Sequence, residues 1–264
     1  MPLVFSAVLP HSPLLIPNIG KENLTFFTQT LSAAAEAAQQ FKAAQPDVVL
    51  ILSSYGPKRK TGLTMNVAPT FRGDLSAFGD LVTELPYTGS LSLPARLREA
   101  LEGKCPLQLT TNENLDYGST LPLFLLETSP LVPILPIAAS GGTLKENYEY
   151  GKLLQHCLFE ENQRIAIVAS ADLSHKLSKK SLAGYSPKAK KLDQKITDCL
   201  VRRDVREALA FSDKALTDAL VEDMNTLALF LGLLDGYDHA GRLLSYEAPF
   251  GVGHAVLSYT STDA

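Results

Sequence analysis

Apolar runs rich in β-branched residues recur along the chain and are typical of buried strands. Six such runs predict strands at Val4–Leu9, Val48–Leu52, Leu131–Ile137, Ile165–Ala169, Leu243–Glu247 and Val252–Tyr259. The last two enclose Ala248-Pro249-Phe250-Gly251, where Pro and Gly favour a turn, so we expect these two strands to form a hairpin.

Helical periodicity fills the intervals between these runs. Apolar residues at steps of three and four share one helix face at Leu24, Phe27, Leu31, Ala34, Ala38 and Phe41, and Pro46 ends that stretch. Further helices are predicted at Leu93–Leu101, Thr120–Glu127, Leu144–Glu160, Pro187–Val201, Val205–Phe211 and Asn225–Leu234. Strands that alternate with helices predict an α/β fold, with a central mixed sheet flanked by helices in a single domain over residues 1–264. The stretch Gly56–Gly89, rich in Gly, Pro, Thr and Ser, predicts long loops with a short strand near Leu63–Ala68.

Composition narrows the function classes. A net charge of −4 does not favour nucleic-acid binding. Six lysines cluster at Lys176, Lys179, Lys180, Lys188, Lys190 and Lys191; an anion-binding patch is one interpretation, and a solvated surface is the favoured one. The three cysteines are far apart, the first residues lack a basic leader, and no apolar run is long enough to span a bilayer. We therefore expect a cytoplasmic protein without nucleic-acid or membrane partners.

Reactive side chains follow the predicted strands, at the sheet edge where α/β proteins usually bind ligands. His11 stands between Pro10 and Pro13 in a stiff loop that suits a metal ligand, although a hydrogen bond at a loop end is the simpler role. Tyr55 follows the second strand, where it can donate a hydrogen bond, bind a hard cation as phenolate, or only pack.

Two later segments add a histidine and carboxylates. In Asp172-Leu173-Ser174-His175 the imidazole can exchange a proton near pH 7 with Asp172 orienting it, or the Asp or Ser can cap a helix beside an unrelated His. Glu247 ends an apolar strand, so its carboxylate requires a cation, a metal or hydrogen bonds. Together, His11, His175 and Glu247 suit non-haem iron chemistry or zinc hydrolysis, and the residues alone leave both open.

Five motifs in order give the chain a family resemblance. They are Pro10-His11-Ser12-Pro13-Leu14-Leu15-Ile16-Pro17, Ser53-Ser54-Tyr55-Gly56-Pro57, Leu115-Asp116-Tyr117-Gly118, Asp172-Leu173-Ser174-His175 and Ser245-Tyr246-Glu247-Ala248-Pro249-Phe250-Gly251-Val252-Gly253. In this pattern the chain resembles the class III extradiol ring-cleaving dioxygenase catalytic subunits (LigB-like), and most closely the Memo-related group called AmmeMemoRadiSam system protein B.

The resemblance implies roles for these residues. Two histidines and a glutamate hold ferrous iron in such dioxygenases, which places His11, Tyr55 and Glu247 at the metal positions, with Tyr55 in place of a histidine. His175 matches the acid/base histidine, and Tyr117 falls at another active-site histidine position. Ser186, in Gly184-Tyr185-Ser186-Pro187, is implied at the substrate pocket in place of a further histidine. Asp172 and His254 are expected at the same pocket from their positions, Asp172 three residues before His175 and His254 near Glu247 in the last strand.

The tyrosines change the expected chemistry. A phenol with a pKa of about 10 binds a metal only by losing a proton against a steep gradient at pH 7. Iron-dependent ring cleavage of a catecholic aromatic is one hypothesis, and a Memo-like protein that binds a small ligand or a partner without catalysis is the alternative. A metal-dependent hydrolase ranks last. Fe²⁺ is the implied cofactor, zinc or no metal stays open, and a homodimer is implied by resemblance alone.

Two further histidines receive ordinary structural interpretations. His156 is predicted within a helix, and His239 in an exposed turn.

Overall fold

The computed structural model describes residues 3–261, in which eight strands form one mixed sheet. The strand order is β10-β11-β1-β9-β2-β8-β3-β6. Their bounds are β1 Leu3–Leu9, β2 Val48–Ser53, β3 Leu63–Asn66, β6 Leu107–Thr110, β8 Ile134–Ala138, β9 Ile165–Ser170, β10 His239–Glu247 and β11 His254–Ser261. The central strands β1, β9, β2 and β8 run parallel, β11 pairs antiparallel with β1, and β10 and β11 form the predicted hairpin.

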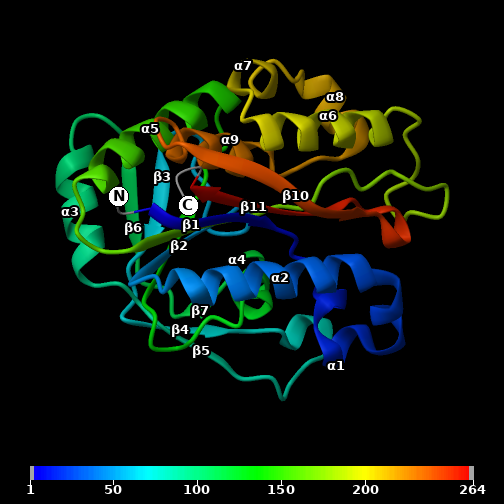
Figure 1. Cartoon of the computed structure of the whole chain (residues 1–264), viewed down its shortest axis with the longest axis horizontal. Coiled ribbons are helices and arrows are strands. Elements are labelled where there is room, and N and C mark those ends of the chain that lie inside the picture. Colours follow the sequence, from blue (N-terminus) through cyan, green and yellow to red (C-terminus); the bar gives the residue numbers. More distant parts are fainter. Residues whose placement is uncertain (1–2, 262–264) are drawn as a thin grey trace.

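Helices cover both faces of this sheet (Figure 1). The helices are α1 Pro17–Gly20, α2 Thr28–Ala44, α3 Ser92–Leu101, α4 Tyr117–Leu125, α5 Leu144–Phe159, α6 Ala189–Arg202, α7 Val205–Ala208, α8 Asp213–Ala219 and α9 Met224–Leu233, with 3-10 turns at Pro13–Leu15, Lys21–Phe27, Ser76–Phe78 and Pro249–Gly251. In Figure 1, α5, α6 and α9 lie above the sheet, and α2 and α4 lie below it. The prediction of a single α/β domain with a mixed sheet flanked by helices is confirmed.

Side chains along the central strands alternate between the two faces of the sheet, and each face has its own hydrophobic core. Leu50 and Leu52 of β2 pack into the core shared with α5 and α9, whereas Val49 and Ile51 pack into the core shared with α2. Side chains of a strand point alternately to its two faces, so a continuous apolar run is required where both faces are covered.

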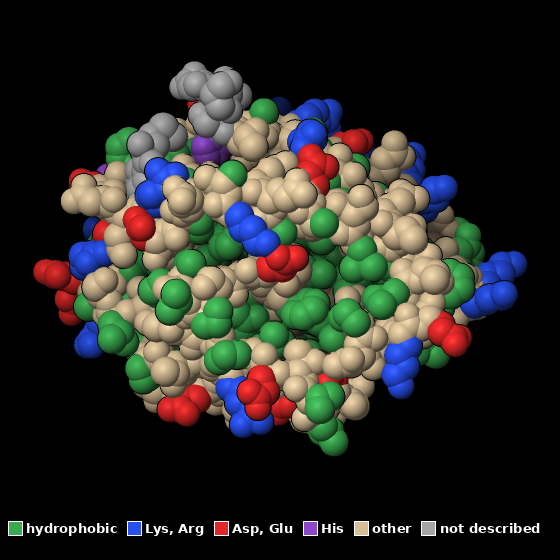
Figure 2. All heavy atoms as spheres, turned by 60° about the horizontal axis from the view of Figure 1, so that its bottom comes forward, with side chains coloured by type: hydrophobic (Ala, Val, Ile, Leu, Met, Phe, Trp, Pro, Cys, Tyr) green, Lys and Arg blue, Asp and Glu red, His purple; other side chains and the backbone are tan. Residues whose placement is uncertain are grey.

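A small second sheet lies on the side of α2 (Figure 1). Its order is β5-β4-β7, with β4 Thr70–Gly73, β5 Leu85–Thr88 and β7 Asn114–Leu115. Figure 2 brings this lower side of the molecule forward and shows hydrophobic side chains gathered around its centre, with charged side chains mostly toward its rim.

Two glycines bring α5 and α9 into direct backbone contact. A Cβ atom on Gly151 would lie 2.2 Å from the carbonyl oxygen of Leu229, and one on Gly232 would lie 2.1 Å from that of Tyr148. Glycine within a helix lowers stability by roughly 0.5–1 kcal/mol relative to alanine, so the close approach is what requires it here.

Several sequence predictions are corrected by the structure. The stretch Gly56–Gly89 holds β3, β4 and β5 rather than loops around one strand, and α8 was not predicted. Leu131 is 88% exposed and lies outside β8, which begins at Ile134 after Pro133. The predicted helix Val205–Phe211 is the four-residue α7, and residues 24–27 form a 3-10 turn before α2. His239 is 4% exposed and begins β10, so its predicted exposed turn is wrong.

The prediction that His156 lies in a helix is confirmed, because this residue is part of α5. No helix within residues 3–261 is long and apolar enough to cross a membrane.

Candidate functional site

The candidate site lies where parallel strands end. His11 follows β1, Tyr55 follows β2, and Ser170 and Asp172 lie at and just beyond the end of β9. Because β9 pairs in parallel with both β1 and β2, their carboxyl ends meet at one edge of the sheet.

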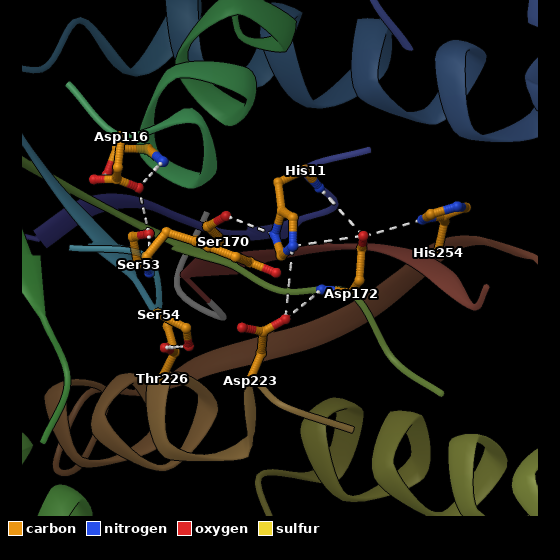
Figure 3. A network of polar contacts seen from close by, with 11 residues as sticks. His11, Ser53, Ser54, Asp116, Ser170, Asp172, Asp223, Thr226 and His254 are labelled. Atoms are coloured by element: carbon orange, nitrogen blue, oxygen red, sulfur yellow. Dashed lines mark hydrogen bonds and ion pairs between the residues drawn. The ribbon is translucent and has the colours of Figure 1, made fainter. Parts of the chain in front are cut away.

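His11 lies at the centre of a buried polar network (Figure 3). Its Nδ1 lies 3.0 Å from Oγ of Ser170, and its backbone N–H donates to Oδ1 of Asp172 over 3.2 Å. Its Nε2 lies 3.5 Å from Oδ2 of Asp172 and 3.8 Å from Oδ2 of Asp223. We call His11, Ser170, Asp172, Asp223 and His254 the His11 network.

Asp172 links two histidines within this network. Its Oδ1 lies 3.0 Å from Nδ1 of His254, and the carboxyl group is buried. Burial alone raises the pKa of Asp172, but the charges of His11 and His254 outweigh it and hold the pKa well below the ordinary value of about 3.9. The Asp172 side chain therefore stays ionised and lies between His11 and His254.

Asp223 is the member of the network that the sequence analysis missed. The backbone N–H of Asp172 donates to its Oδ2 over 3.0 Å, while its Oδ1 has no hydrogen-bond partner within residues 3–261. Burial raises the pKa of Asp223, against the opposing charge of His11. In sequence, Asp223 immediately precedes an apolar helix and has the pattern of a helix cap, which gives no sign of a contact with His11.

Two tyrosines stand beside the His11 ring. The ring centroids lie 4.9 Å apart for His11 and Tyr55, 4.3 Å for Tyr55 and Tyr117, and 5.9 Å for His11 and Tyr117. Burial, the hydrogen bond with Tyr117 and the charge of Asp223 raise the pKa of Tyr55 far above its ordinary value. Burial likewise raises the pKa of Tyr117, so both phenols are neutral at pH 7.

Local capping fixes the position of Tyr117. Asp116 is the N-cap of α4 and accepts a hydrogen bond from the backbone N–H of Ser119 over 2.9 Å. Oγ of Ser53, the last residue of β2, donates to the same carboxylate over 2.7 Å. The cap therefore ties the start of α4 to the end of β2, and brings Tyr117 against Tyr55.

The side chain of Glu247 contacts α2 and not the His11 network. It lies opposite His254 in the β10–β11 pairing, but its Oε1 accepts a 2.6 Å hydrogen bond from the backbone N–H of Thr30 in the first turn of α2. The partial positive charge of a helix N-terminus suits a carboxylate, and this contact supplies the partner that the sequence required.

His175 and Ser186 also lie outside the His11 network. The backbone N–H of His175 donates to the carbonyl of Ala219 at the end of α8, and that of Ser186 donates to the carbonyl of Lys176. Residues 171–188 contain no helix, so the alternative of a helix cap at Asp172 or Ser174 is wrong. The charge of His175 is among those that lower the pKa of Asp172, so this side chain still acts on the site electrostatically.

The side chains at the implied iron positions do not fit that metal as they are placed. Both ring nitrogens of His11 face protein side chains, and Tyr55 is a neutral phenol. The carboxylate of Glu247 accepts a hydrogen bond from the backbone of α2. Within residues 3–261, no group of three or more His, Cys, Asp or Glu side chains is arranged to hold a metal ion.

Residues 6–257 match the family described as the catalytic LigB subunit of aromatic ring-opening dioxygenase. The chain therefore belongs to this family, as its motifs indicated.

Two curated proteins are similar to the chain. Protein CA_C1420 of Clostridium acetobutylicum is 23% identical over 261 residues, which are 95% of this chain and 56% of that protein. A 2,3-dihydroxyphenylpropionate/2,3-dihydroxicinnamic acid 1,2-dioxygenase of Mycobacterium ulcerans is 28% identical over 180 residues, 63% of this chain and 55% of that protein. The chain thus spans little more than half the length of either relative.

A solved structure shares the fold. The uncharacterized protein JW3007 of Escherichia coli K12 superposes with a TM-score of 0.69 at 18% identity, covering 97% of this chain and 99% of that one.

Proposed function

We propose that this chain is a ring-opening dioxygenase relative that binds a small hydroxylated aromatic molecule beside Tyr55 and Tyr117 without holding iron through the ligand set implied by resemblance. The observation that carries the proposal is that protein side chains contact both ring nitrogens of His11. Its Nδ1 faces Ser170, and its Nε2 lies between Asp172 and Asp223. A metal at Nε2 would have to displace these contacts, and the neutral phenol of Tyr55 is a poor second ligand.

Aromatic side chains support the assignment of the ligand class. Tyr55 and Tyr117 are half-buried, and the ring of Phe78 lies 5.1 Å from that of Tyr117 at a steep angle. Such rings favour an aromatic partner in an offset or edge-on arrangement. Their neutral hydroxyls can donate to and accept from the hydroxyls of a catechol.

Catechol binding to the metal-free protein tests this proposal. We expect saturable binding by calorimetry after chelation of metals, weakened up to about tenfold by Tyr55→Phe or Tyr117→Phe because one hydroxyl hydrogen bond is lost. Tyr185→Phe is the matched control, since Tyr185 is 50% exposed on the loop before α6. No binding by the metal-free protein would contradict the proposal.

Iron-dependent ring cleavage is the second candidate, and family membership supports it. Fe²⁺ would supply the redox chemistry if it were held at the implied positions His11, Tyr55 and Glu247, and His175 stands in the matching position to move a proton. Anaerobic reconstitution with Fe²⁺ followed by catechol and oxygen decides between the candidates. Consumption of oxygen with catechol, lost in His175→Ala, supports this candidate; stoichiometric catechol binding with no oxygen uptake supports the first.

A Memo-like role in binding a partner protein rests on the resemblance alone. It predicts that the metal-free protein binds no catechol and that reconstituted protein consumes no oxygen, which distinguishes it from both candidates above.

A further inference from the structure

A second concave site lies between α6 and α8, outside the His11 network. The two helices pack together (Figure 1) and form the walls of an open groove of about 490 Å³. Its lining combines cationic side chains with an apolar floor, from Lys188, Lys191, Leu192, Lys195, Ser212, Lys214, Ala215 and Asp218. We call this site the lysine groove.

The spacing along the chain places three lysines on one side of the groove. Lys188 is the N-cap of α6, and Lys191 and Lys195 follow it at steps of three and four, which share one helix face. From the other side, Lys214 of α8 lies 3.0 Å from Asp218, the one acid in the lining.

The charges of the α6 lysines are not neutralised by the protein. None of Lys188, Lys191 and Lys195 forms an ion pair with a carboxylate in residues 3–261, and all three are exposed. Four lysines and one aspartate line the groove, although the whole chain has a net charge of −4. The groove therefore carries positive charge, against the balance of the whole molecule.

The shape and floor of the groove indicate more than a simple ion. Leu192 and Ala215 are apolar, and the methylene stems of lysines add apolar surface beneath their charged ends. A volume of about 490 Å³ lies within the range of roughly 300–1,000 Å³ usual for small-molecule sites, and far exceeds one phosphate.

We propose that the lysine groove binds a phosphorylated small molecule, with two or more phosphate charges on Lys188, Lys191 and Lys195 and its organic body over Leu192 and Ala215. Lysine ammonium groups act as point charges toward phosphate and need no fixed planar geometry, which suits three flexible side chains along one helix. A phospholipid headgroup and a soluble phosphorylated metabolite share this chemistry.

Calorimetry with adenosine diphosphate and with inorganic pyrophosphate, on the full chain, tests the proposal. We expect one molecule of adenosine diphosphate to bind, and more tightly than pyrophosphate, because the organic body occupies the apolar part. The triple variant Lys188→Gln, Lys191→Gln, Lys195→Gln should bind at least about tenfold more weakly, because three charge-assisted contacts to phosphate are lost. Ala215→Glu, which places bulk and negative charge in the groove, should have the same effect while retaining all four lysines.

The control variant makes the same charge change elsewhere: Lys21→Gln, Lys58→Gln, Lys104→Gln. Binding within about twofold of the wild type is expected, since loss of distant, screened charges has little effect at physiological salt. Equal losses in the groove variant and the control would overturn the proposal, because binding would then follow net charge alone. Circular dichroism of each variant confirms that it is folded.

Co-sedimentation with phosphatidylcholine vesicles that contain phosphatidic acid distinguishes the two sources of phosphate. Binding to these vesicles but to neither soluble probe, lost in the groove variant, assigns the groove to a lipid headgroup. Binding of adenosine diphosphate without vesicle binding assigns it to a soluble molecule. Failure of the wild type to bind any of the three probes would overturn the proposal.

Discussion

The His11 network and the lysine groove hold their charges in opposite ways. In the His11 network, imidazoles and carboxylates are buried and lie against one another, with Asp172 between His11 and His254. In the lysine groove, Lys188, Lys191 and Lys195 are exposed and have no carboxylate partner within the described residues. Buried charges are tolerated only when paired, whereas exposed charges remain stable in water without a partner.

This difference determines what each site has available for a ligand. The His11 network satisfies most of its polar atoms internally, so a metal would compete with existing contacts. In the lysine groove, the three lysines of α6 have no carboxylate partner within residues 3–261, so an anion would add contacts to them without breaking an ion pair. The following predictions test the two sites, beginning with the largest expected effect.

Removal of Asp172 should have the largest effect on stability. Asp172→Ala leaves His11 and His254 without their shared partner, and breaking a buried ion pair from one side costs about 3–5 kcal/mol. Urea unfolding measures the change. Asp198→Ala, at an exposed position of α6, is the control and should change stability by less than about 0.5 kcal/mol. Equal effects of the two substitutions would show that the network is not a stabilising charge cluster.

Acid should weaken the His11 network through the same carboxylate. Because the pKa of Asp172 is lowered in the folded state, the unfolded chain binds more protons below pH about 4, and stability falls as the pH drops through that range. Protonation leaves the side chain in place, so the loss should be smaller than in Asp172→Ala. Unfolding midpoints at successive pH values, in the wild type and in Asp172→Asn, check this; identical acid slopes would assign the loss to other groups.

Replacement of Tyr55 should alter metal affinity. Tyr55→His places a second imidazole beside His11 and removes a phenol whose proton must otherwise be lost, so Zn²⁺ and Fe²⁺ should bind measurably more tightly than to the wild type. At a hundredfold excess over the dissociation constant, a bound metal adds about 2.7 kcal/mol of stability. Thermal shifts with and without metal measure the gain, and Tyr185→His controls for an added exposed histidine. A shift equal to that of the control would place the barrier to metal binding in Asp172 and Asp223 rather than in Tyr55.

The smallest effect is expected at Glu247. Glu247→Gln removes one charge from the N-terminal turn of α2 and should cost about 0.3–1 kcal/mol while leaving catechol binding unchanged. Urea unfolding and calorimetry measure both quantities. A loss of catechol binding would place Glu247 in the ligand site, as the resemblance implies.

The fold was predictable because its determinants are local. The first five residues of β2 are all apolar because both faces of the sheet are covered, and this pattern can be recognised in the sequence. The small sheet was missed because its strands are short, and Thr70–Gly73 alternates exposed and buried residues within a stretch rich in Gly and Pro.

The site was predictable only in part, because its contacts join distant segments. The end of β1 and the end of β9 carry histidine and aspartate in recognisable motifs, so His11 and Asp172 were singled out. The approach of Asp223 to His11 depends on how α9 packs, which no local pattern contains. Glu247 fits a metal-ligand motif in the sequence, but its carboxylate accepts a hydrogen bond from the first turn of α2. A carboxylate is stabilised by the partial positive charge of a helix N-terminus as it is by a cation, so the sequence alone does not tell the two apart.

The glycine contact between α5 and α9 fixes the position of α9, and with it the position of Asp223 in the candidate site. α9 begins at Met224, one residue after Asp223, and Gly151 and Gly232 leave no space for even a methyl group between the helices. A methyl group at Gly232 would push the two helices apart or shift α9 along its axis. Asp223, the N-cap of α9, would then move with the helix. The distance between Asp223 and His11 therefore depends on the packing of Gly232 near the other end of α9. A substitution there can change the geometry of the site without contacting any of its residues.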